Sequence, residues 1–408
     1  MSADVIVIGA GITGISAALL LQAEGAKITI IDPLIPGDEG QASFGNAGVI
    51  AIGSILPLAS RHAFSDMLKM LVSRDAPMFA PAGHLPKLAR FGLSFLSAGR
   101  HKYDATVEAL SGISMTAVDD HMALNVEEAK ALIRHGPYAS VFRSAKEFKN
   151  ERHHFEEKRS LGFQIKYIKN EKLDDIDPNL SSDFRYAAMV ENCAWIESPM
   201  QYMQALYQRF KYNGGKHVVE PVTKLDNNSV TTQNASHHAD KIIVAAGAYS
   251  ARILKSIGMN IPMEAERGYH LFMPNCSLRP NHPFMHGTAS IVATPMKGGL
   301  RVAGIAEYGG LDRAPRKQPI AFLKRHLREI YPDIDLTNAT EWMGRRPTLP
   351  DSMPMIGAIA SHRNIICAFG AQHIGLTLGP RIGILAKDLA LGRKLNYDLT
   401  AFNPHRFD

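Results

Sequence analysis

A run of apolar, mostly β-branched residues opens the chain and has the pattern of a buried strand. Residues 4–8 read DVIVI, and such an unbroken apolar run is typical of a strand covered on both faces. A glycine-rich turn follows, and residues 15–24 (ISAALLLQAE) are rich in helix formers and end at Gly25. Residues 27–31 (KITII) have a second strand pattern, so the order strand, helix, strand predicts a nucleotide-binding parallel sheet.

The remainder of the chain carries weaker but readable patterns. Apolar positions at helical spacing predict helices over residues 65–73, 85–96, 105–124, from Pro199 onward, over 320–330, and over 380–391. Short β-branched or alternating runs predict strands over residues 218–225, within 235–247 before a small-residue turn, and over 269–273, 290–294, 300–304 and 364–369. Between about residues 60 and 195 no strand–glycine–helix unit recurs. Pieces of one parallel sheet are therefore separated by a region of another kind.

Composition and charge exclude several classes of protein. Apolar residues make up 46% of the 408 positions and charged residues 21%, which indicates a globular chain with sizeable cores. The 45 Lys and Arg against 39 Asp and Glu leave a charge of +6 without a long basic run, so no nucleic-acid partner is predicted. The three cysteines form no CxxC pair, which argues against a zinc site and for a reducing compartment.

The start of the chain and its apolar stretches bear on location. MSADVIVIGAG has no basic segment before its apolar run, so it does not have the pattern of a secretory signal. The longest nearly apolar stretch, residues 49–60, falls short of the roughly twenty residues that a spanning helix needs. We expect a cytoplasmic protein, with peripheral contact to the inner face of the cell membrane as an additional option.

The turn after the first strand carries a dinucleotide-binding pattern. Residues 9–14 read GAGITG, which matches GxGxxG between a strand and a helix. Gly9 allows the tight turn, Gly11 lets a pyrophosphate approach the backbone, and Gly14 lets the helix pack closely on the strand. Asp32 ends the second strand, where a carboxylate can accept the ribose hydroxyls and disfavours a 2′-phosphate. The pattern predicts FAD or NAD rather than NADP.

Three later segments favour the larger cofactor, FAD. They are the small, amide-rich stretch 41–48 (QASFGNAG), the strand with its small-residue turn 242–250 (IIVAAGAYS), and the stretch 369–377 (FGAQHIGLT) before the last helix. The last helix would direct its N-terminal dipole at the flavin. The candidate FAD-binding residues are Gly9, Gly11, Ile12, Thr13, Gly14, Asp32, Ser43, Asn46, Ala47, Gly48, Val222, Ala246, Gly247, Gly370, Gly375, Leu376 and Thr377.

These patterns predict an α/β (overall α+β) fold with two domains. A Rossmann-like FAD-binding domain is assembled from residues 1–60, 196–260 and 341–408. An inserted substrate-binding domain, with a mixed or antiparallel sheet and helices, comprises residues 61–195 and 261–340.

With these motifs the chain resembles a known family, the FAD-dependent amino-acid oxidoreductases that include D-amino acid oxidase, glycine oxidase and bacterial D-amino acid dehydrogenase. The resemblance rests on GAGITG (9–14), SFGNAG (43–48), VAAGAYS (244–250), ERGYHL (266–271), WMGRRPTLPDSMPMIG (342–357) and FGAQHIGLTLGP (369–380). The second and fifth motifs look closest to the dehydrogenase branch, including D-hydroxyproline dehydrogenases. One position departs from that branch, because Ala371 stands where related dehydrogenases often carry histidine.

The resemblance implies hydride transfer from the substrate Cα to the flavin, giving an imine that hydrolyses to a 2-oxo acid and ammonia. Arg346 matches the family's carboxylate-binding arginine, and its neighbour Arg345 is the alternative ligand. Tyr269 matches a substrate-side aromatic, and His373 is a further candidate; the core of the protein is the alternative place for the tyrosine. His270 is a weaker candidate. No protein base is required if the amine binds neutral.

The resemblance leaves several functions open. The main prediction is a dehydrogenase of a D-amino acid or small cyclic imino acid, such as D-proline or hydroxy-D-proline. The alternatives are a glycine or sarcosine oxidase that uses oxygen, or a flavin-binding electron-transfer subunit. The predicted acceptor is a quinone or another carrier, and oligomerisation stays open.

Two groups of residues outside these motifs bear on membrane and metal binding. Apolar stretches in 49–96 are flanked by Lys69, Arg74, Lys87 and Arg90, which suits an interfacial segment, although the same helices could pack on the substrate domain. The histidine pairs 153–154 and 237–238 consist of adjacent residues whose side chains diverge on a helix or strand, so no metal site is predicted.

Overall fold

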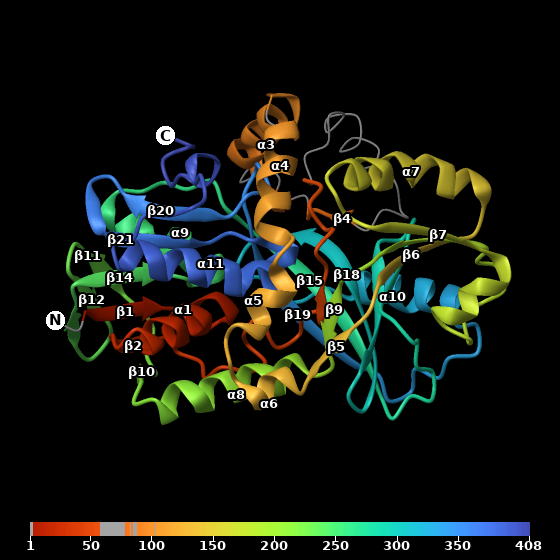
Figure 1. Cartoon of the computed structure of the whole chain (residues 1–408), viewed down its shortest axis with the longest axis horizontal. Coiled ribbons are helices and arrows are strands. Elements are labelled where there is room, and N and C mark those ends of the chain that lie inside the picture. The colour runs from red at the N-terminus through yellow and green to blue at the C-terminus, as the bar shows by residue number, and fades with distance from the viewer. Residues whose placement is uncertain (1–2, 58–77, 82, 85–87, 102) are drawn as a thin grey trace.

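The computed structural model describes residues 3–57, 78–81, 83–84, 88–101 and 103–408. Figure 1 shows two sheet-containing parts side by side, with the N-terminal strands in one part and helices α7 and α10 in the other. The chain passes between the two parts several times, as the interleaved colours in Figure 1 show. This confirms the predicted α/β class, with a parallel sheet and a second, mixed sheet.

The first part is built on a six-stranded sheet in the order β10-β2-β1-β14-β21-β20. Its strands are β1 (Asp4–Ile8), β2 (Lys27–Ile31), β10 (Lys216–Val218), β14 (Lys241–Val244), β20 (Met355–Ile359) and β21 (His362–Phe369). All neighbours pair in parallel except β20, which runs antiparallel to β21. Val5 and Val7 on β1 and Ile243 on β14 are fully buried, as the apolar runs predict for central parallel strands.

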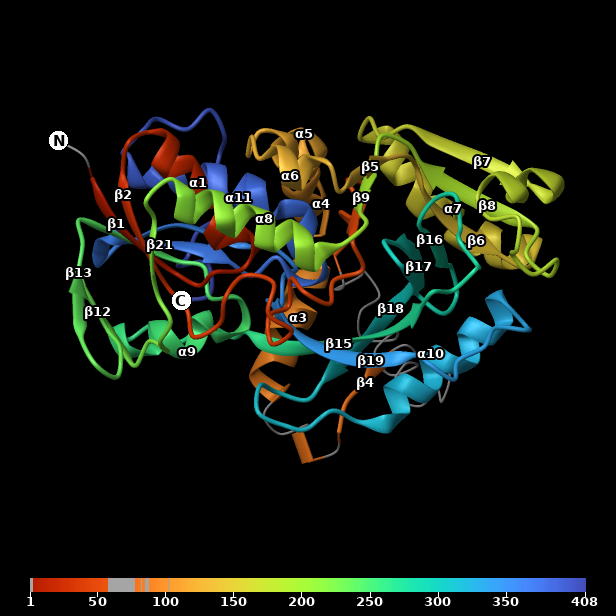
Figure 2. The same ribbon diagram turned by 90° about the horizontal axis from the view of Figure 1, so that it is seen from below.

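Two layers cover this sheet. On one face lie α1 (Ile12–Ala23), α8 (Pro199–Tyr212) and α11 (Gly375–Ala390), as Figures 1 and 2 show. Helices α1 and α11 approach closely because Gly379 faces Ile12 and Gly383 faces Ser16: a Cβ on either glycine would lie within 3 Å of its neighbour. On the other face lie α9 (Ser250–Leu254) and a small sheet of β11 (Lys224–Asp226), β12 (Ser229–Thr231) and β13 (Ser236–His238).

Helix α11 begins earlier than the sequence predicts. It starts at Gly375 rather than at Pro380, so the proline lies within the helix. Proline has no N–H to donate to the carbonyl four residues earlier, which here belongs to Leu376. The Nε2 atom of His121, on α5 (Ala117–Met122), donates to that carbonyl at 2.9 Å instead. A side chain from a distant helix therefore satisfies the backbone group that the proline leaves free.

The second part is built on a mixed sheet in the order β19-β15-β18-β17-β16-β6-β8-β7, with β4 (Met78–Phe79) paired to β18. Its strands are β6 (Tyr138–Phe142), β7 (Ile165–Lys169), β8 (Tyr186–Val190), β15 (Glu264–Pro274), β16 (Phe284–His286), β17 (Ile291–Met296), β18 (Gly299–Tyr308) and β19 (Thr340–Thr348). Helix α10 (Lys317–Ile330) packs Leu323 and Leu327 against one face. Helix α7 (Ala145–Ser160) packs Phe148 and Phe155 against Phe142 on the other face.

A third group of elements links the two parts. It contains α3 (Ala89–His101), α4 (Tyr103–Ser114), α5, α6 (Glu127–Lys130) and a three-stranded sheet of β3 (Val49–Ile50), β9 (Ala194–Ile196) and β5 (Ile133–His135). Val107, Leu110 and Ile133 are buried in the same core as α1 and α11. Residues 103–133, assigned from the sequence to the substrate domain, thus pack with the parallel sheet, whereas β19, assigned to the FAD-binding domain, lies in the mixed sheet. The exact domain boundaries stay a prediction.

Other predicted elements differ in detail. The helix predicted over 105–124 is two helices, α4 and α5, and the one predicted over 65–73 lies outside the described residues. Strands β6, β7 and β8 lie in the region where the pattern indicated only helices. Each has five residues, and such short runs are hard to distinguish from helical segments by periodicity alone.

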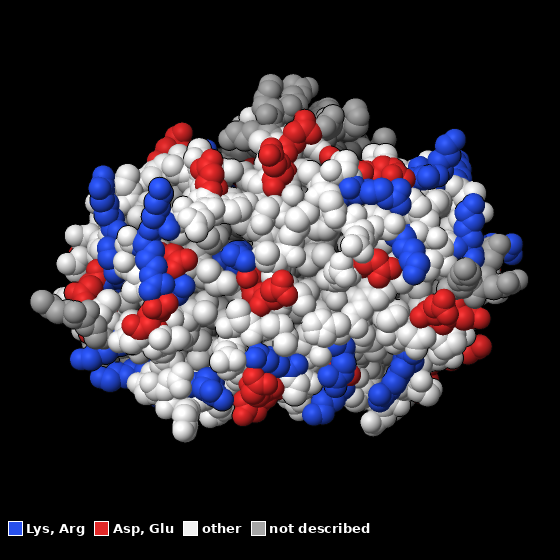
Figure 3. All heavy atoms as spheres, viewed as in Figure 1, with Lys and Arg blue, Asp and Glu red and all other residues white. Residues whose placement is uncertain are grey.

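The surface facing the viewer in Figure 3 carries no large area of one charge. Cationic and anionic side chains alternate over this face, with uncharged surface between them. This distribution agrees with the small net charge of +6. In the part of the chain that the structure describes, no helix has the length and apolarity to cross a membrane.

Candidate active site

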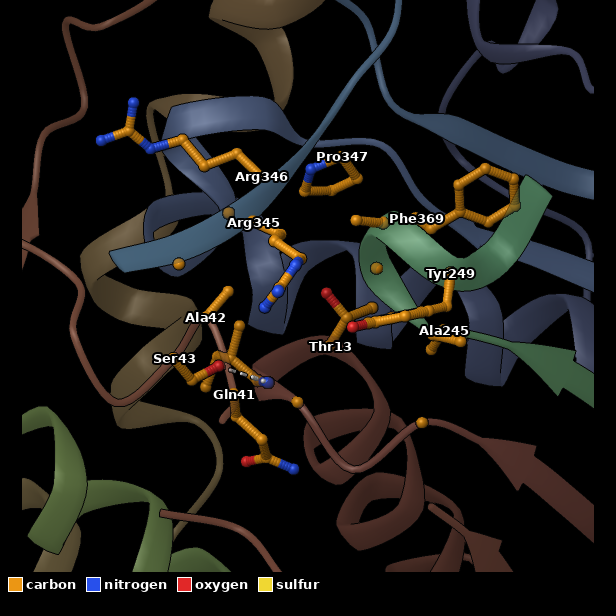
Figure 4. A pocket seen from close by; sticks show the side chains of 18 of the residues that line it. Thr13, Gln41, Ala42, Ser43, Ala245, Tyr249, Arg345, Arg346, Pro347 and Phe369 are labelled. Atoms are coloured by element: carbon orange, nitrogen blue, oxygen red, sulfur yellow. Dashed lines mark hydrogen bonds between the residues drawn. The ribbon is translucent and has the colours of Figure 1, made fainter. Parts of the chain in front are cut away.

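A cavity of about 600 Å³ lies between the parallel sheet and the mixed sheet. Its walls include the carboxyl ends of β1, β2, β14 and β21 on one side and residues of β15 and β19 on the other. Ligands of open parallel sheets bind at this edge, because the loops after the strands diverge there. Figure 4 shows the cavity from close by.

Most of the predicted cofactor residues meet at this cavity although they lie far apart in sequence. Those that line it are Gly9, Gly11, Ile12, Thr13, Asp32, Ser43, Asn46, Ala47, Val222, Ala246, Gly247, Gly370, Gly375 and Leu376. Gly14, Gly48 and Thr377 lie behind the wall. A Cβ on Gly14 would lie 1.9 Å from the Gly9 carbonyl oxygen, one on Gly48 would crowd the Ile196 carbonyl, and the Thr377 hydroxyl accepts from the Ala51 N–H at 3.1 Å.

The glycine turn leaves an open approach to the first helix. Gly9 has a φ of +107°, and a Cβ there would lie 2.4 Å from the Ala245 carbonyl oxygen, so only glycine fits. At Gly11 the nearest atom to an added Cβ is the Ser43 hydroxyl at 3.7 Å, an ordinary contact distance, and Gly11 lines the cavity. Gly11 has no side chain with which to cap α1, and the Ser43 hydroxyl accepts from the Ile12 N–H at 3.2 Å. A helix N-terminus behind a bare glycine fits the pyrophosphate of a dinucleotide.

Asp32 closes the nucleotide side of the cavity. Its Oδ2 accepts from the Ala10 N–H at 2.7 Å, and its Oδ1 accepts from the Leu34 N–H at 2.8 Å. Burial raises the pKa of this carboxyl, and the two backbone donors oppose that shift. Since each carboxylate oxygen can accept more than one hydrogen bond, Asp32 retains acceptors for ribose hydroxyls. The turn and this acid together fit FAD.

Side chains on strands of the mixed sheet hold the SFGNAG loop (residues 43–48) in place. The Nη1 atom of Arg301 donates to the Asn46 carbonyl at 2.6 Å, and the Nδ1 atom of His270 donates to the Gly45 carbonyl at 2.9 Å. Trp342 stacks on His270, and a Cβ on Gly45 would lie 2.1 Å from the indole ring. Burial, with the charge of Arg301, lowers the pKa of His270 to about 3, so the ring is neutral. The loop is therefore held by residues of the other part.

Arg345 and Arg346 leave β19 in opposite directions, as Figure 4 shows. Arg346 lies over Gly268, and its Nη1 atom donates to Glu266 Oε1 at 2.7 Å and to the Ile305 carbonyl at 2.9 Å. Arg345 extends toward the side of the cavity that holds Thr13, and its Nε donates to the Leu311 carbonyl at 2.6 Å. The two arginines, which sequence could not separate, therefore face different regions.

The other two catalytic candidates also border the cavity. His373 lines it, and burial lowers its pKa, with Glu266 raising and Arg346 lowering it to a smaller extent. Tyr269 is among the residues that line the cavity, but its hydroxyl donates to Glu307 in the core of the mixed sheet and accepts from the Arg316 N–H at 3.2 Å. Burial and this carboxylate raise the pKa of Tyr269 to about 12. The hydroxyl is thus already bound within the core.

Several residues of the site were not identified from the sequence. Arg301 and Trp342 contact the loop of residues 43–48, which lies some 250 and 300 positions earlier in the chain. Only the pairing of strands in the folded chain brings them close to this loop. Glu266 did leave a signal, since an acid stands within the strand-like motif ERGYHL, where a buried position is expected to be apolar. Its partner could be found only in the folded chain.

One histidine-rich cluster has the composition of a metal site. Among the described residues, ligand atoms of His286, His326 and Glu329 lie within 4.8 Å of one another. The Nη2 atom of Arg143 donates to Glu329 Oε2 at 2.5 Å, and both histidines also contact that oxygen. Because a guanidinium cation already neutralises this carboxylate, we assign the cluster to a partly buried ion-pair network.

Comparison with known proteins identifies the family of this chain. The family model described as "FAD dependent oxidoreductase" matches residues 4–389. The chain is 31% identical to a D-amino-acid oxidase of Bradyrhizobium diazoefficiens over 99% of this chain and 98% of that protein. It is 25% identical to a D-amino acid dehydrogenase of Neisseria meningitidis, over 95% of this chain and 96% of that protein.

The fold also matches solved structures. Glycine oxidase from Geobacillus kaustophilus superposes with a TM-score of 0.77 at 16% identity, covering all of both chains. At this identity the likeness shows the fold alone. On the family match and the Bradyrhizobium relative, the chain belongs to the FAD-dependent oxidoreductases of this family, and FAD is its cofactor.

Proposed function

We propose that this protein oxidises a D-amino acid or a small cyclic imino acid, and that it passes the electrons to a carrier other than oxygen. The observation that carries the substrate class is Arg346, a guanidinium on the cavity wall opposite the FAD-binding turn. A planar guanidinium binds a carboxylate through two parallel hydrogen bonds, which fixes the position of the Cα. The named relatives, an oxidase and a dehydrogenase of D-amino acids, support the same class.

The FAD supplies the acceptor for the hydride that leaves the substrate Cα. The chain's own residues orient the substrate and hold its surroundings. Arg346 binds the carboxylate, and His373 lies near it on the cavity wall. Arg345, on the fingerprint side, lies where a cation would stabilise the phosphates of FAD. The hydroxyl of Tyr269 serves the mixed sheet rather than the substrate.

The experiment that tests this function is anaerobic mixing of the purified holoprotein with a panel of D- and L-amino acids, prolines and N-methylglycines. Loss of the oxidised flavin absorbance with a D-amino acid or D-proline is the expected result. Reduction by glycine or sarcosine alone would favour the oxidase-type substrate. A flavin that none of these compounds reduces would point to an electron-transfer subunit instead.

The electron acceptor needs a separate measurement. Since one relative is called an oxidase and others dehydrogenases, oxygen is the second candidate acceptor. We expect the substrate-reduced protein to reoxidise slowly in air and quickly with a quinone analogue. Rapid oxygen uptake with stoichiometric peroxide would make the protein an oxidase.

Peripheral membrane contact stays a prediction. The cations on which it rests lie outside the described residues or have no described side chain, at Lys69, Arg74, Lys87 and Arg90. Sedimentation with anionic liposomes at low salt tests it independently of the acceptor. A protein that stays in the supernatant would remove this prediction alone.

A further inference from the structure

A buried acid on β15 contacts the arginine that lines the cavity. Side chains alternate along a strand, so Glu264 and Glu266 lie on the same face of β15, and Glu266 binds Arg346, which borders the cavity. Glu266 is 2% exposed; its Oε1 accepts from Nη1 of Arg346 at 2.7 Å and its Oε2 accepts from the Thr348 hydroxyl at 2.9 Å. A buried carboxylate with these two partners forms an ion pair within the site.

The pair fixes one edge of the guanidinium and leaves another open. Both hydrogens of Nη1 are used, one by Glu266 and one by the Ile305 carbonyl at 2.9 Å. Ile305 has a φ of +69°, a conformation that a β-branched residue adopts only at a cost, and it lies in the middle of the strand β18. Among the described residues, Nε and Nη2 of Arg346 have no hydrogen-bond partner. That edge presents two parallel N–H groups, as carboxylate binding requires.

The charges around this pair are few and can be named. On β15 itself Glu264 contacts His84, on β18 the buried Tyr308 lies near both charges, and on the turn before α11 His373 does so. Burial raises the pKa of Tyr308, so this hydroxyl keeps its proton at pH 7, and the pKa of His373 is lowered in the same surroundings. The Arg346–Glu266 pair therefore has a net charge near zero in a buried setting.

We propose that Glu266 is a positioning and specificity-determining residue, which directs the Nε–Nη2 edge of Arg346 into the cavity and makes the site prefer carboxylates that carry their own ammonium group. At the binding step, before the amine gives its proton to solvent, an amino-acid zwitterion leaves the site neutral, whereas a carboxylate without an amine leaves an uncompensated negative charge in a medium of low dielectric constant. The same balance favours release of a 2-oxo acid product. This inference rests on the proposed function, and it adds the discrimination between amino acids and amine-free acids.

The test compares two acid-to-amide variants of the FAD-loaded protein. Glu266→Gln removes the charge and keeps the shape, while Glu264→Gln is the matched control, since Glu264 lies on the same face but contacts His84 and the Gly310 N–H. Propionate is titrated against the flavin absorbance, and KM and kcat are measured for the amino acid that reduces the flavin. In Glu266→Gln we expect propionate to bind about tenfold more tightly, with a higher KM for the amino acid. Glu264→Gln should leave the ratio of propionate affinity to amino-acid affinity unchanged.

Two further variants separate charge from position. Glu266→Asp keeps the charge but shortens the reach to Nη1, so it should keep the selectivity and lose catalytic efficiency. Thr348→Val removes only the hydroxyl on Oε2 and should shift the selectivity in the same direction as Glu266→Gln, by about threefold. Thr348→Val also provides the test if Glu266→Gln loses its FAD, as judged from the flavin spectrum.

The inference is overturned if Glu266→Gln, or Thr348→Val in its place, leaves the ratio of propionate to amino-acid affinity at the wild-type value. It is also overturned if Glu264→Gln changes that ratio equally, because the effect would then belong to any nearby charge. Propionate binding does not require turnover. Failure of the proposed function would show separately, as a wild-type flavin that no amino acid reduces.

Discussion

The two parts of the molecule bury different kinds of side chain on their strands. In the parallel sheet, the buried positions of β1 and β14 are apolar, and Val5, Val7 and Ile243 have no exposed surface. In the mixed sheet, β15, the second strand from one edge, buries the charged residues Glu266 and Arg267. Apolar residues need only a covered face, whereas a buried charge needs a specific partner. The half that carries the nucleotide-binding turn is therefore defined by local pattern, and the half proposed to bind the substrate is defined by pairings between distant strands.

The largest expected effect tests the division of labour between the adjacent arginines. Arg346→Ala removes the cation opposite a substrate carboxylate, which commonly costs about 2–5 kcal/mol, so kcat/KM should fall by orders of magnitude. The flavin spectrum should change little, because Arg346 faces the mixed sheet. Anaerobic flavin reduction over a range of substrate concentrations measures the loss.

Arg345→Ala is the matched control, one residue away on the same strand. Since Arg345 extends toward the fingerprint side, its removal should weaken FAD binding and spare the substrate KM. The opposite result, with a large loss of substrate binding in Arg345→Ala and a mild one in Arg346→Ala, would exchange the two roles. The proposed division, with Arg346 on the substrate side and Arg345 on the FAD side, would then be wrong.

The second effect concerns the glycine turn of the parallel half. Gly9→Ala places a Cβ 2.4 Å from a backbone oxygen at a φ of +107°, so we expect the loss of roughly 3 kcal/mol or more of stability, together with FAD. Gly25→Ala has a similar φ of +82° but no atom within 4 Å of the added Cβ, so it should cost about 1 kcal/mol and keep FAD. Thermal unfolding and released flavin fluorescence measure both. Equal losses would mean that backbone conformation, not close packing, decides this turn.

The third effect is a pH dependence of the free energy of unfolding that comes from buried histidines in the mixed half. Burial lowers the pKa of His286 to about 4 and of His270 to about 3, and both lie on strands of the mixed sheet. Because the unfolded chain binds protons near pH 6.5 and the folded chain resists them, stability is full above that pH and falls as the pH drops toward 4. At pH 5 each histidine should cost about 2 kcal/mol. Urea unfolding at pH 7.5 and pH 5.0 measures the difference.

Replacing His286 by Gln, which does not titrate, should reduce that pH difference. A stability that is the same at both pH values would contradict the assignment of neutral, buried histidines. If His286→Gln loses as much stability between pH 7.5 and pH 5.0 as the wild type does, the pH dependence belongs to other groups.

The smallest effect tests the link between His121 and α11. His121→Phe leaves the Leu376 carbonyl without the donor that Pro380 cannot supply, and the expected cost is about 1–2 kcal/mol. In a Pro380→Ala background the helix supplies its own N–H, so the same substitution should cost less. Urea unfolding of the four proteins of this double-mutant cycle gives the coupling free energy. A coupling of zero would show that the histidine does not compensate for the proline.

The fingerprint side of the site could be predicted from the sequence because its determinants are local. The positive φ of Gly9, the open position of Gly11 and the acid at Asp32 all lie within 24 consecutive residues. Pattern also located α1, α8, β14 and β21. It failed for β6, β7 and β8, whose five-residue runs are too short to show a period, and for the start of α11, where the pattern predicts a beginning at Pro380 but the helix begins at Gly375.

On the substrate side of the site, the sequence motifs do not predict the partners of the side chains. A sequence motif named the pair of arginines at 345 and 346, but only the pleat of β19 decided which of them faces Glu266. The hydroxyl of Tyr269, a residue placed in the substrate site by motif, is bound by Glu307 from a neighbouring strand.

The sequence by itself determined the cofactor class, the parallel sheet and the turn that receives the pyrophosphate. The physical reason is that backbone conformation and apolar burial depend on residues close together in the chain. The tertiary structure alone decided the partners of Arg346, His270 and His121, because a buried polar group is satisfied by whichever donor or acceptor the fold brings to it, at any distance along the sequence.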